Sequence, residues 1–302
     1  MPSPTDFNLS PYYDDFAETK KFHRILFRPA FAVQARELTQ SQTILQNQIE
    51  RVSDHLFEKG AMVIPGEIGY DLNYYSVKIT SFTDSQNVGV TLTDFVGLTL
   101  TGQTSGVKAI VVNTTATDGT DPNTLYVKYV DSGTDSSTDK FTATETISVS
   151  TTLQGQVTTV SAVVEDCFTG SAAYIGAGVY YINGFHVSVA EQTLILDKYS
   201  NTPSYRIGLQ VSESFVTPNA DPSLNDNAQG VSNTNAPGAH RFKIDLTLTK
   251  LSLASASDNN FVELLRLKAG IIQNQVRTTE YAVLEDTLAR RTFDESGDYS
   301  IR

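Results

Sequence analysis

The sequence predicts a mainly β protein with an N-terminal α-helical, coiled-coil segment and with β-sandwich or barrel domains, one inserted in another. Three observations predict this fold class. Apolar residues repeat every seven positions between Ala35 and Gly60, which is the period of a coiled-coil helix. After Gly60 the hydrophobic pattern changes to a period of two, which is typical of strands. Between residues 83 and 164 Thr, Ser, Gly, Asp and Val dominate, which indicates a separate unit.

These boundaries divide the chain into four parts. We expect an extended N-terminal arm over residues 1–33 and an oligomerising helix over 34–60. We expect residues 61–82 plus 165–302 to form the main β-domain with short helices, and residues 83–164 to form an inserted small β-domain.

The N-terminal arm is predicted from its prolines and from aromatic residues that follow neither a helical nor a strand period. Such aromatics must be covered by the helix, by a neighbouring subunit or by a partner protein. We predict that they make a partner contact, with the residues Phe7, Tyr12, Tyr13, Phe16, Phe22 and Phe27.

The helix at 34–60 is predicted to form an oligomer interface. Its heptads place Ala35, Gln42, Ile49 and Leu56 at the a positions and Leu38, Leu45 and Val52 at the d positions. A polar residue at an a position, here Gln42, fixes register and strand number, and we favour a homotrimer. Gly60 is a suitable C-cap because glycine adopts the left-handed conformation at little cost. The alternative is an ordinary amphipathic helix that lies on its own core.

Short strands are predicted after the helix. From Ala61 to Phe82 the alternation indicates strands interrupted at Pro65-Gly66 and at residues 71–73. Residues 83–164 have the pattern of a small closed barrel or sandwich. Asn183-Gly184 predicts a type I′ hairpin turn, because both residues tolerate positive φ.

The remaining β-domain is predicted from two alternating strands, 205–216 and 239–253, joined by a polar loop. Helical segments are predicted at Asn260–Leu267 and at 278–296, the latter with Tyr281, Leu284 and Leu288 on one face. A strand pattern begins again at Gly297, so we expect the natural chain to continue past Arg302.

The composition of the chain limits the kinds of partner that it can bind. The 302-residue chain has a net charge of −12, and it lacks the clustered Lys and Arg that nucleic-acid binding needs. A single cysteine, Cys167, excludes a disulfide framework. No apolar run approaches the length of a membrane span, and the N-terminus lacks a signal-peptide pattern. We expect no nucleic acid and no membrane among the partners.

Residues with catalytic or metal-binding chemistry are sparse. The four histidines lack metal-ligand spacing, and there is no nucleophile elbow and no phosphate-binding loop. Two acidic clusters are compatible with glycoside cleavage or with a calcium site, although each is explained more simply by caps and turns. One consists of Asp294, Glu295 and Asp298, and the other consists of Asp221 and Asp226 with Asn225 and Asn227. We expect no enzyme activity, no cofactor and no metal.

Several segments resemble a known family. Residues 11–16 and 22–66, which include PYYDDF and FHRILFRPAFAVQARELTQSQTILQNQIERVSDHLFEKG, are similar to the N-terminal region of virion structural proteins from contractile-tailed, T-even-like cyanophages. The resemblance continues at 178–187, 196–209, 221–244 and 288–299. It implies a baseplate wedge or tail-fibre-connector protein in the virion tail, assembled in the host cytoplasm. It supplies no catalytic residues.

We therefore expect a structural component of a phage tail baseplate, assembling as a homotrimer and connecting wedge proteins to tail fibres. The alternative is a host-surface glycan-binding adhesin or a depolymerase fragment, in which the inserted domain or the loop from Asp221 to Gly238 would touch glycan. A head–neck connector is a third hypothesis.

Overall fold

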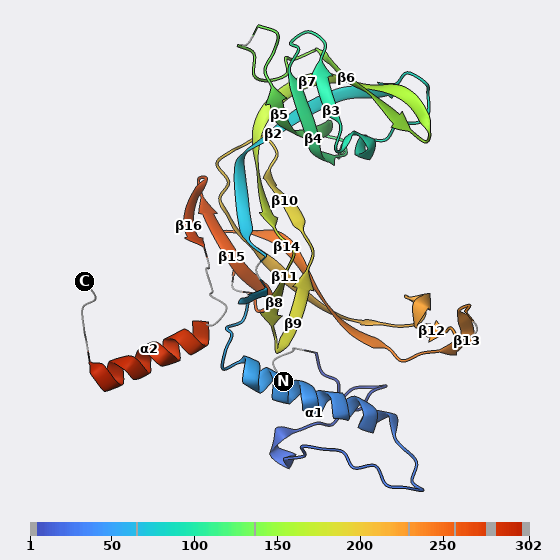
Figure 1. The fold of residues 1–302 in the computed structure, drawn as a ribbon, viewed down its shortest axis with the longest axis vertical. Helices are drawn as coiled ribbons and strands as arrows, with labels where there is room; N and C mark the ends of the chain where they lie inside the picture. Colours follow the sequence, from blue (N-terminus) through green and yellow to red (C-terminus); the bar gives the residue numbers. More distant parts are fainter. Residues whose placement is uncertain are drawn as a thin grey trace.

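The computed structural model describes residues 5–64, 66–135, 137–228, 230–256, 258–275 and 282–297. The predicted fold class is confirmed in its main feature, because the described chain is built mostly of strands in several sheets and has few helices. Figure 1 shows an elongated molecule, with one group of strands at the top, a second group in the middle and helix α1 (Ala35–Ser53) at the lower end.

The remaining elements are as follows. The strands are β1 (Met62–Ile64), β2 (Ile68–Asp84), β3 (Thr99–Gly102), β4 (Lys108–Thr115), β5 (Asn123–Asp131), β6 (Thr146–Leu153), β7 (Gln156–Ile175), β8 (Gly178–Ile182), β9 (Phe185–Val189), β10 (Gln192–Asp197), β11 (Tyr205–Val216), β12 (Asn225–Asp226), β13 (Asn233–Pro237), β14 (Arg241–Ser252), β15 (Phe261–Lys268) and β16 (Ile271–Gln275). The other helices are α2 (Ala282–Ser296) and the 3₁₀ turns η1 (Glu18–Lys20), η2 (Leu92–Phe95) and η3 (Pro222–Leu224).

The upper group of strands closes on itself. In the seven-stranded sheet the order is β10-β7-β2-β5-β4-β3-β6, and β6 also pairs with β7. The strands β7, β2, β5, β4, β3 and β6 therefore form a closed antiparallel ring. Its interior is filled by fully buried side chains, among them Phe95, Leu100 and Ile147. Closure rests on a short pairing of β3 with Ile147 and Ser148, and the rest of β6 pairs with β7 alone.

A second hydrophobic core lies in the middle of the molecule. It joins the lower halves of β2 and β7 to β8, β9 and β10, and to the four-stranded sheet of order β14-β11-β15-β16. Tyr180, Ile182, Ile207 and Leu209 are fully buried there. The long strands β2 and β7 run from this core into the upper ring, so the two cores share a continuous backbone (Figure 1).

The predicted hairpin at Asn183-Gly184 is confirmed. Strands β8 and β9 pair antiparallel from Gly178↔Val189 to Ile182↔Phe185, which leaves the two turn residues between them. Asn183 has φ of 49° and Gly184 has φ of 85°, as a type I′ turn requires. The turn matters for the lower end of the molecule because the Gly184 carbonyl accepts a hydrogen bond from the Gln46 side chain of α1 at 2.6 Å.

Substitution of this glycine tests how much the turn contributes. We expect Gly184→Ala to lower the free energy of unfolding by about 1–2 kcal/mol, because a side chain in the left-handed region clashes with its own backbone. The control is Ser188→Ala, on an exposed position of β9, which we expect to be neutral. Urea denaturation followed by circular dichroism measures both; equal midpoints would show that the turn tolerates a side chain.

Three predicted local structures differ from those observed. The helix predicted over 34–60 ends at Ser53, and the segment predicted as helix at Asn260–Leu267 is strand β15, paired with β11 and β16. The predicted break at residues 71–73 is a bulge inside a continuous β2, where the register with β7 shifts between Asp71 and Tyr74. In each case pairing with distant strands or hairpins decides the local conformation.

The end of α1 has a specific cause. The Tyr181 hydroxyl donates a hydrogen bond to the Asp54 carboxylate at 2.5 Å, and the Gly60 N–H donates to the Tyr181 carbonyl at 2.8 Å. These contacts draw the chain onto strand β8 directly after Ser53. Leu56 consequently lies in a turn and not at a heptad position of the helix.

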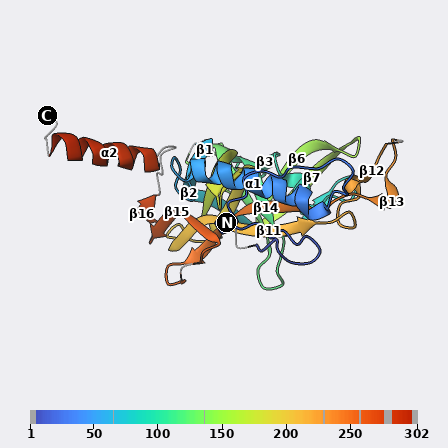
Figure 2. The same ribbon diagram turned by 90° about the horizontal axis from the view of Figure 1, so that it is seen from below.

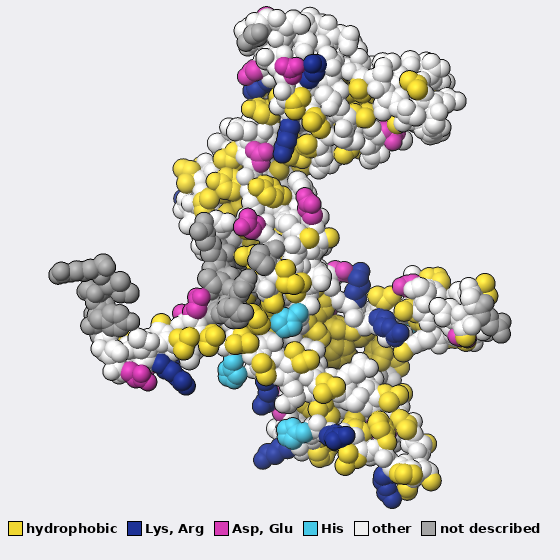
Figure 3. Space-filling view, in the orientation of Figure 1, with side chains coloured by type: hydrophobic (Ala, Val, Ile, Leu, Met, Phe, Trp, Pro, Cys, Tyr) yellow, Lys and Arg dark blue, Asp and Glu magenta, His cyan; other side chains and the backbone are white. Residues whose placement is uncertain are grey.

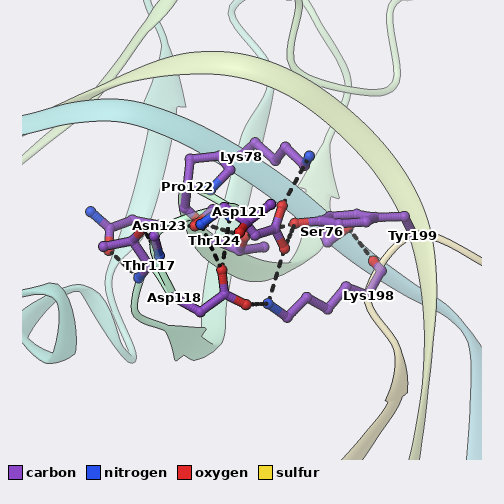
Figure 4. Close-up of polar contacts among 12 residues, drawn as sticks. Ser76, Lys78, Thr117, Asp118, Asp121, Pro122, Asn123, Thr124, Lys198 and Tyr199 are labelled. Atoms are coloured by element: carbon purple, nitrogen blue, oxygen red, sulfur yellow. Dashed lines mark hydrogen bonds and ion pairs between the residues drawn. The ribbon is translucent and has the colours of Figure 1, made fainter.

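A polar cluster joins the upper ring to the middle core. Figure 4 shows Asp121, from the loop before β5, between Lys78 of β2 and Lys198 and Tyr199, which follow β10. Its carboxylate lies 3.1 Å from the Lys78 Nζ, 3.0 Å from the Lys198 Nζ and 2.5 Å from the Tyr199 hydroxyl. The Lys78 ammonium also lies 4.2 Å from the centre of the Tyr199 ring. We call these four residues the junction cluster.

Candidate assembly interface

Helix α1 is held against the molecule by the arm on one side and by the β8–β9 hairpin on the other. Asp14 is buried and accepts a hydrogen bond from the Thr43 hydroxyl at 2.5 Å. Glu18 accepts from Asn47 at 2.7 Å and from Arg51 at 2.6 Å. Seen from below in Figure 2, α1 crosses the ends of the strands. The helix is therefore fixed in orientation by polar contacts along one face.

The opposite face of α1 carries exposed apolar side chains. Their exposed fractions are 52 % for Leu38, 65 % for Leu45, 49 % for Ile49 and 63 % for Val52. These four residues lie on one side of the helix because they are spaced by three, four and seven positions. We call them the α1 stripe. Exposed clusters of this kind mark interaction surfaces more often than they mark neutral protein surface.

The seven predicted interface residues are thus divided by the structure. The four residues of the α1 stripe share one exposed face, and Gln42 is exposed beside them. Ala35 is the first residue of the helix and is also exposed. Leu56 is separated from the rest because α1 has already ended. Among the described residues the heptads reach no second helix, and the apolar residue that α1 buries against its own chain is Ile44, outside both a and d positions.

The predicted partner-contact aromatics also separate into two groups. Phe7 and Tyr12 pack on strands β11 and β14 of their own chain, with ring centres 5.0 Å apart for Phe7 and Phe242 and 5.1 Å for Tyr12 and Phe215. Phe16 is half-buried. Tyr13, Phe22 and Phe27 are 51–60 % exposed. Sequence reasoning missed Leu26 and Phe31, which are 76 % and 61 % exposed in the same loop.

Figure 3 shows hydrophobic side chains gathered over the arm and α1 at the lower end of the molecule. A cavity of about 660 Å³ opens there between α1 and the β11–β14 strands. Phe185, Phe215 and Phe242 form its aromatic wall, and Gln42 and Glu50 of α1 form part of its polar wall. Burial raises the pKa of the Glu50 carboxyl, and the neighbouring Asp54 adds to this effect. The cavity lies beside the α1 stripe, since Gln42 borders both.

Two of the acidic residues weighed for catalysis, Asp221 and Asp226, are explained by local structure. Asp221 caps η3 by accepting from the Ser223 N–H, and Asp226 accepts from the Ala228 N–H in the next turn. Burial raises the pKa of the Cys167 thiol to about 11, so the reactive thiolate is disfavoured. Asp298 lies outside the described residues.

The described part of the chain contains no group of three or more His, Cys, Asp or Glu side chains arranged to hold a metal ion. Among the same residues, no helix combines the length and the apolar character needed to cross a membrane.

The chain matches a family model over most of its length. A family model described as a domain of unknown function (DUF4815) matches residues 10–140 and 151–302. No curated protein and no solved structure matches the chain.

Proposed function

We propose that this chain, which belongs to the DUF4815 family, is a structural subunit that self-associates through the α1 stripe and serves in a phage tail baseplate. The observation that carries the proposal is the exposure of Leu38, Leu45, Ile49 and Val52 on a helix whose orientation is already fixed by its own chain. A soluble protein gains about 25 cal/mol for each Å² of such surface that it covers.

The heptad spacing supports a helix bundle as the form of self-association. Leu38, Leu45 and Val52 are seven residues apart, and Ile49 completes the a/d pattern in the last full heptad of α1. With 19 residues α1 is too short to associate strongly alone, so the sheets and arm must fix its position first. We propose a trimer, with Gln42 at a central a position setting the register.

The assignment to a virion rests on the sequence resemblance to baseplate proteins of contractile-tailed cyanophages. The fold is compatible with such a role. The closed β-ring and the projecting β12–β13 hairpin lie away from α1, so they remain available for contacts to other proteins when α1 self-associates (Figure 1). We propose that the nested β-domains, with residues 83–164 as the inserted one, contact wedge or fibre proteins, and that the protein is not an enzyme.

The solution mass of the wild-type chain tests self-association. One chain has a mass of 33.0 kDa, and we expect light scattering to give about three times this value at micromolar concentration. A mass of one chain over the whole accessible concentration range would contradict the proposal. The location is tested separately by antibody labelling of phage particles in the electron microscope, where label at the distal end of the tail is expected and label confined to heads or necks would contradict it.

The second candidate function is glycan binding or cleavage by an adhesin or depolymerase fragment. It is favoured only by the long polar segment from Asp221 to Gly238, which projects from the sheets as the β12–β13 hairpin. Release of reducing sugar from host polysaccharide that is lost in Asp226→Ala would support it. Absence of both binding and release would exclude it.

A further inference from the structure

The loop of residues 21–33, which leads into α1, is exposed and basic. It carries Lys21, Arg24 and Arg28 and no acidic residue, whereas the rest of the chain has 19 basic and 34 acidic residues. We call this segment the basic loop. Within the described residues none of its three cations forms an ion pair, although the adjacent Lys20 pairs with Asp15 at 2.8 Å.

The same loop holds large apolar side chains away from its own chain. Phe22, Leu26, Phe27 and Phe31 are exposed by 51–76 %. Residues 22–28 are neither helix nor strand. The Arg28 guanidinium lies 4.2 Å from the centre of the Phe31 ring, a contact inside the loop. Exposed apolar side chains beside cations that form no ion pair indicate a surface that another molecule covers.

The course of the arm places this loop beside α1. Asp14 contacts Thr43, and Glu18 contacts Asn47 and Arg51, so the arm follows the helix toward its C-terminal end. The basic loop then returns to the helix start at Gln34. The arm thus lies along the polar face of α1, opposite the α1 stripe, and the basic loop joins the first turn of the same helix.

Acidic side chains are present around the C-terminal end of α1. Glu50 lies in the last turn of the helix and is half-buried, whereas Asp54 and Glu58 follow the helix and are exposed. In the described chain none of them forms an ion pair, and Asp54 accepts only the Tyr181 hydroxyl. We call these three residues the acidic end. The cations of the basic loop on one copy and the carboxylates of the acidic end on another copy are therefore opposite charges that form no ion pair within their own chains.

We propose that the basic loop of one copy clasps α1 of a second copy, with Arg24 and Arg28 facing the acidic end and the loop aromatics covering the neighbouring apolar surface. This inference rests on the proposed self-association and names the second contact that it uses. The contact is heterologous, because a loop meets a helix, and such contacts close into a ring when the rotation fits. Anionic membrane is disfavoured as the occupant, since a chain of net charge −12 is repelled by it.

The test is a set of charge reversals in the full chain, read as the dissociation constant of the oligomer from dilution series in sedimentation or light scattering. We expect Arg24→Glu with Arg28→Glu to raise this constant about tenfold or more, because like charges then face each other. Glu50→Lys with Glu58→Lys should weaken the oligomer by a similar factor. The chain with all four changes should regain most of the wild-type affinity.

The matched control is Lys128→Glu with Lys268→Glu, which makes the same change in net charge at exposed positions elsewhere. We expect it to leave the dissociation constant within about twofold of wild type. An unchanged constant in the loop variant, with wild type oligomeric, would overturn the clasp and leave the proposed function intact. A monomeric wild type would overturn both. If the loop variant lost binding to phosphatidylserine vesicles while its oligomer was unchanged, the partner of the basic loop would be a membrane and not a second copy.

Discussion

Leu45→Asp combined with Ile49→Asp is expected to convert the oligomer into monomers, so that the mass in solution falls from about three chains to one. The physical reason is that these side chains are exposed in the single chain but would be buried in a helix bundle. In the single chain Leu45 and Ile49 are 65 % and 49 % exposed, so a carboxylate in their place costs the fold little. In a helix bundle each would bury a charge without a partner, which costs several kcal/mol per helix.

The control for this change is Val130→Asp with Val157→Asp, which replaces two apolar residues on the upper ring that are 54 % and 73 % exposed. This variant should keep the wild-type mass, and both variants should keep the wild-type circular dichroism spectrum. If the α1 variant remained an oligomer with an unaltered dissociation constant, the stripe would not be the association surface. If it lost its circular dichroism signal, the stripe residues would be needed by the fold of the single chain.

The heptad pattern shows how far sequence reasoning reaches in this protein. Spacing alone places Leu38, Leu45 and Val52 on one face, and the structure leaves that face exposed. Spacing does not reveal where the helix ends, because the end is set by the bond between Asp54 and Tyr181, residues 127 positions apart. The position of a C-capping glycine is a local signal, and here a long-range contact overrides it.

Strand β15 is the clearest failure of local pattern. Its sequence FVELLRLK has an apolar run that is compatible with either a buried helix or a strand. Phe261, Val262, Leu264 and Leu265 are all buried, which removes the alternation that would identify a half-buried strand. Only pairing with β11 and β16 distinguishes the two conformations, and that pairing is not encoded in a short window.

The arm illustrates the same limit at the candidate interface. Its aromatic residues are visible in the sequence, but their division into two groups is not. Tyr12 is held by His240, 228 residues later, through a contact of 2.7 Å between its hydroxyl and the ring Nδ1. Phe22 and Phe27 lie only ten to fifteen residues from Tyr12 and find no such partner. Which aromatics remain exposed depends on the position of β11 and β14, and this was beyond prediction from periodicity.

Asp121→Asn in the junction cluster is expected to lower the free energy of unfolding at pH 7 by about 2–3 kcal/mol, the range for hydrogen bonds to a charged group that become weak or are lost. The carboxylate accepts from Tyr199 and lies beside Lys78 and Lys198, and its side chain is only 19 % exposed. The control is Asp131→Asn, which breaks the exposed pair with Lys108 and should cost less than about 1 kcal/mol.

The pH dependence gives the sharper test of this cluster. The Tyr199 hydroxyl and the Lys198 ammonium lower the pKa of Asp121 from 3.8 to about 2. A lowered folded-state pKa means that the unfolded chain binds the proton first, so the stabilisation is complete above about pH 4 and is lost as the pH falls toward 2. Urea titrations of wild type and Asp121→Asn, followed by tyrosine fluorescence, should therefore differ most at pH 5–7 and converge near pH 2. If the difference in unfolding free energy persisted unchanged at pH 2, Asp121 would stabilise the junction by its shape and not by its charge. If at neutral pH this difference were no larger than that for Asp131→Asn, the junction cluster would not be a stabilising contact between the two cores.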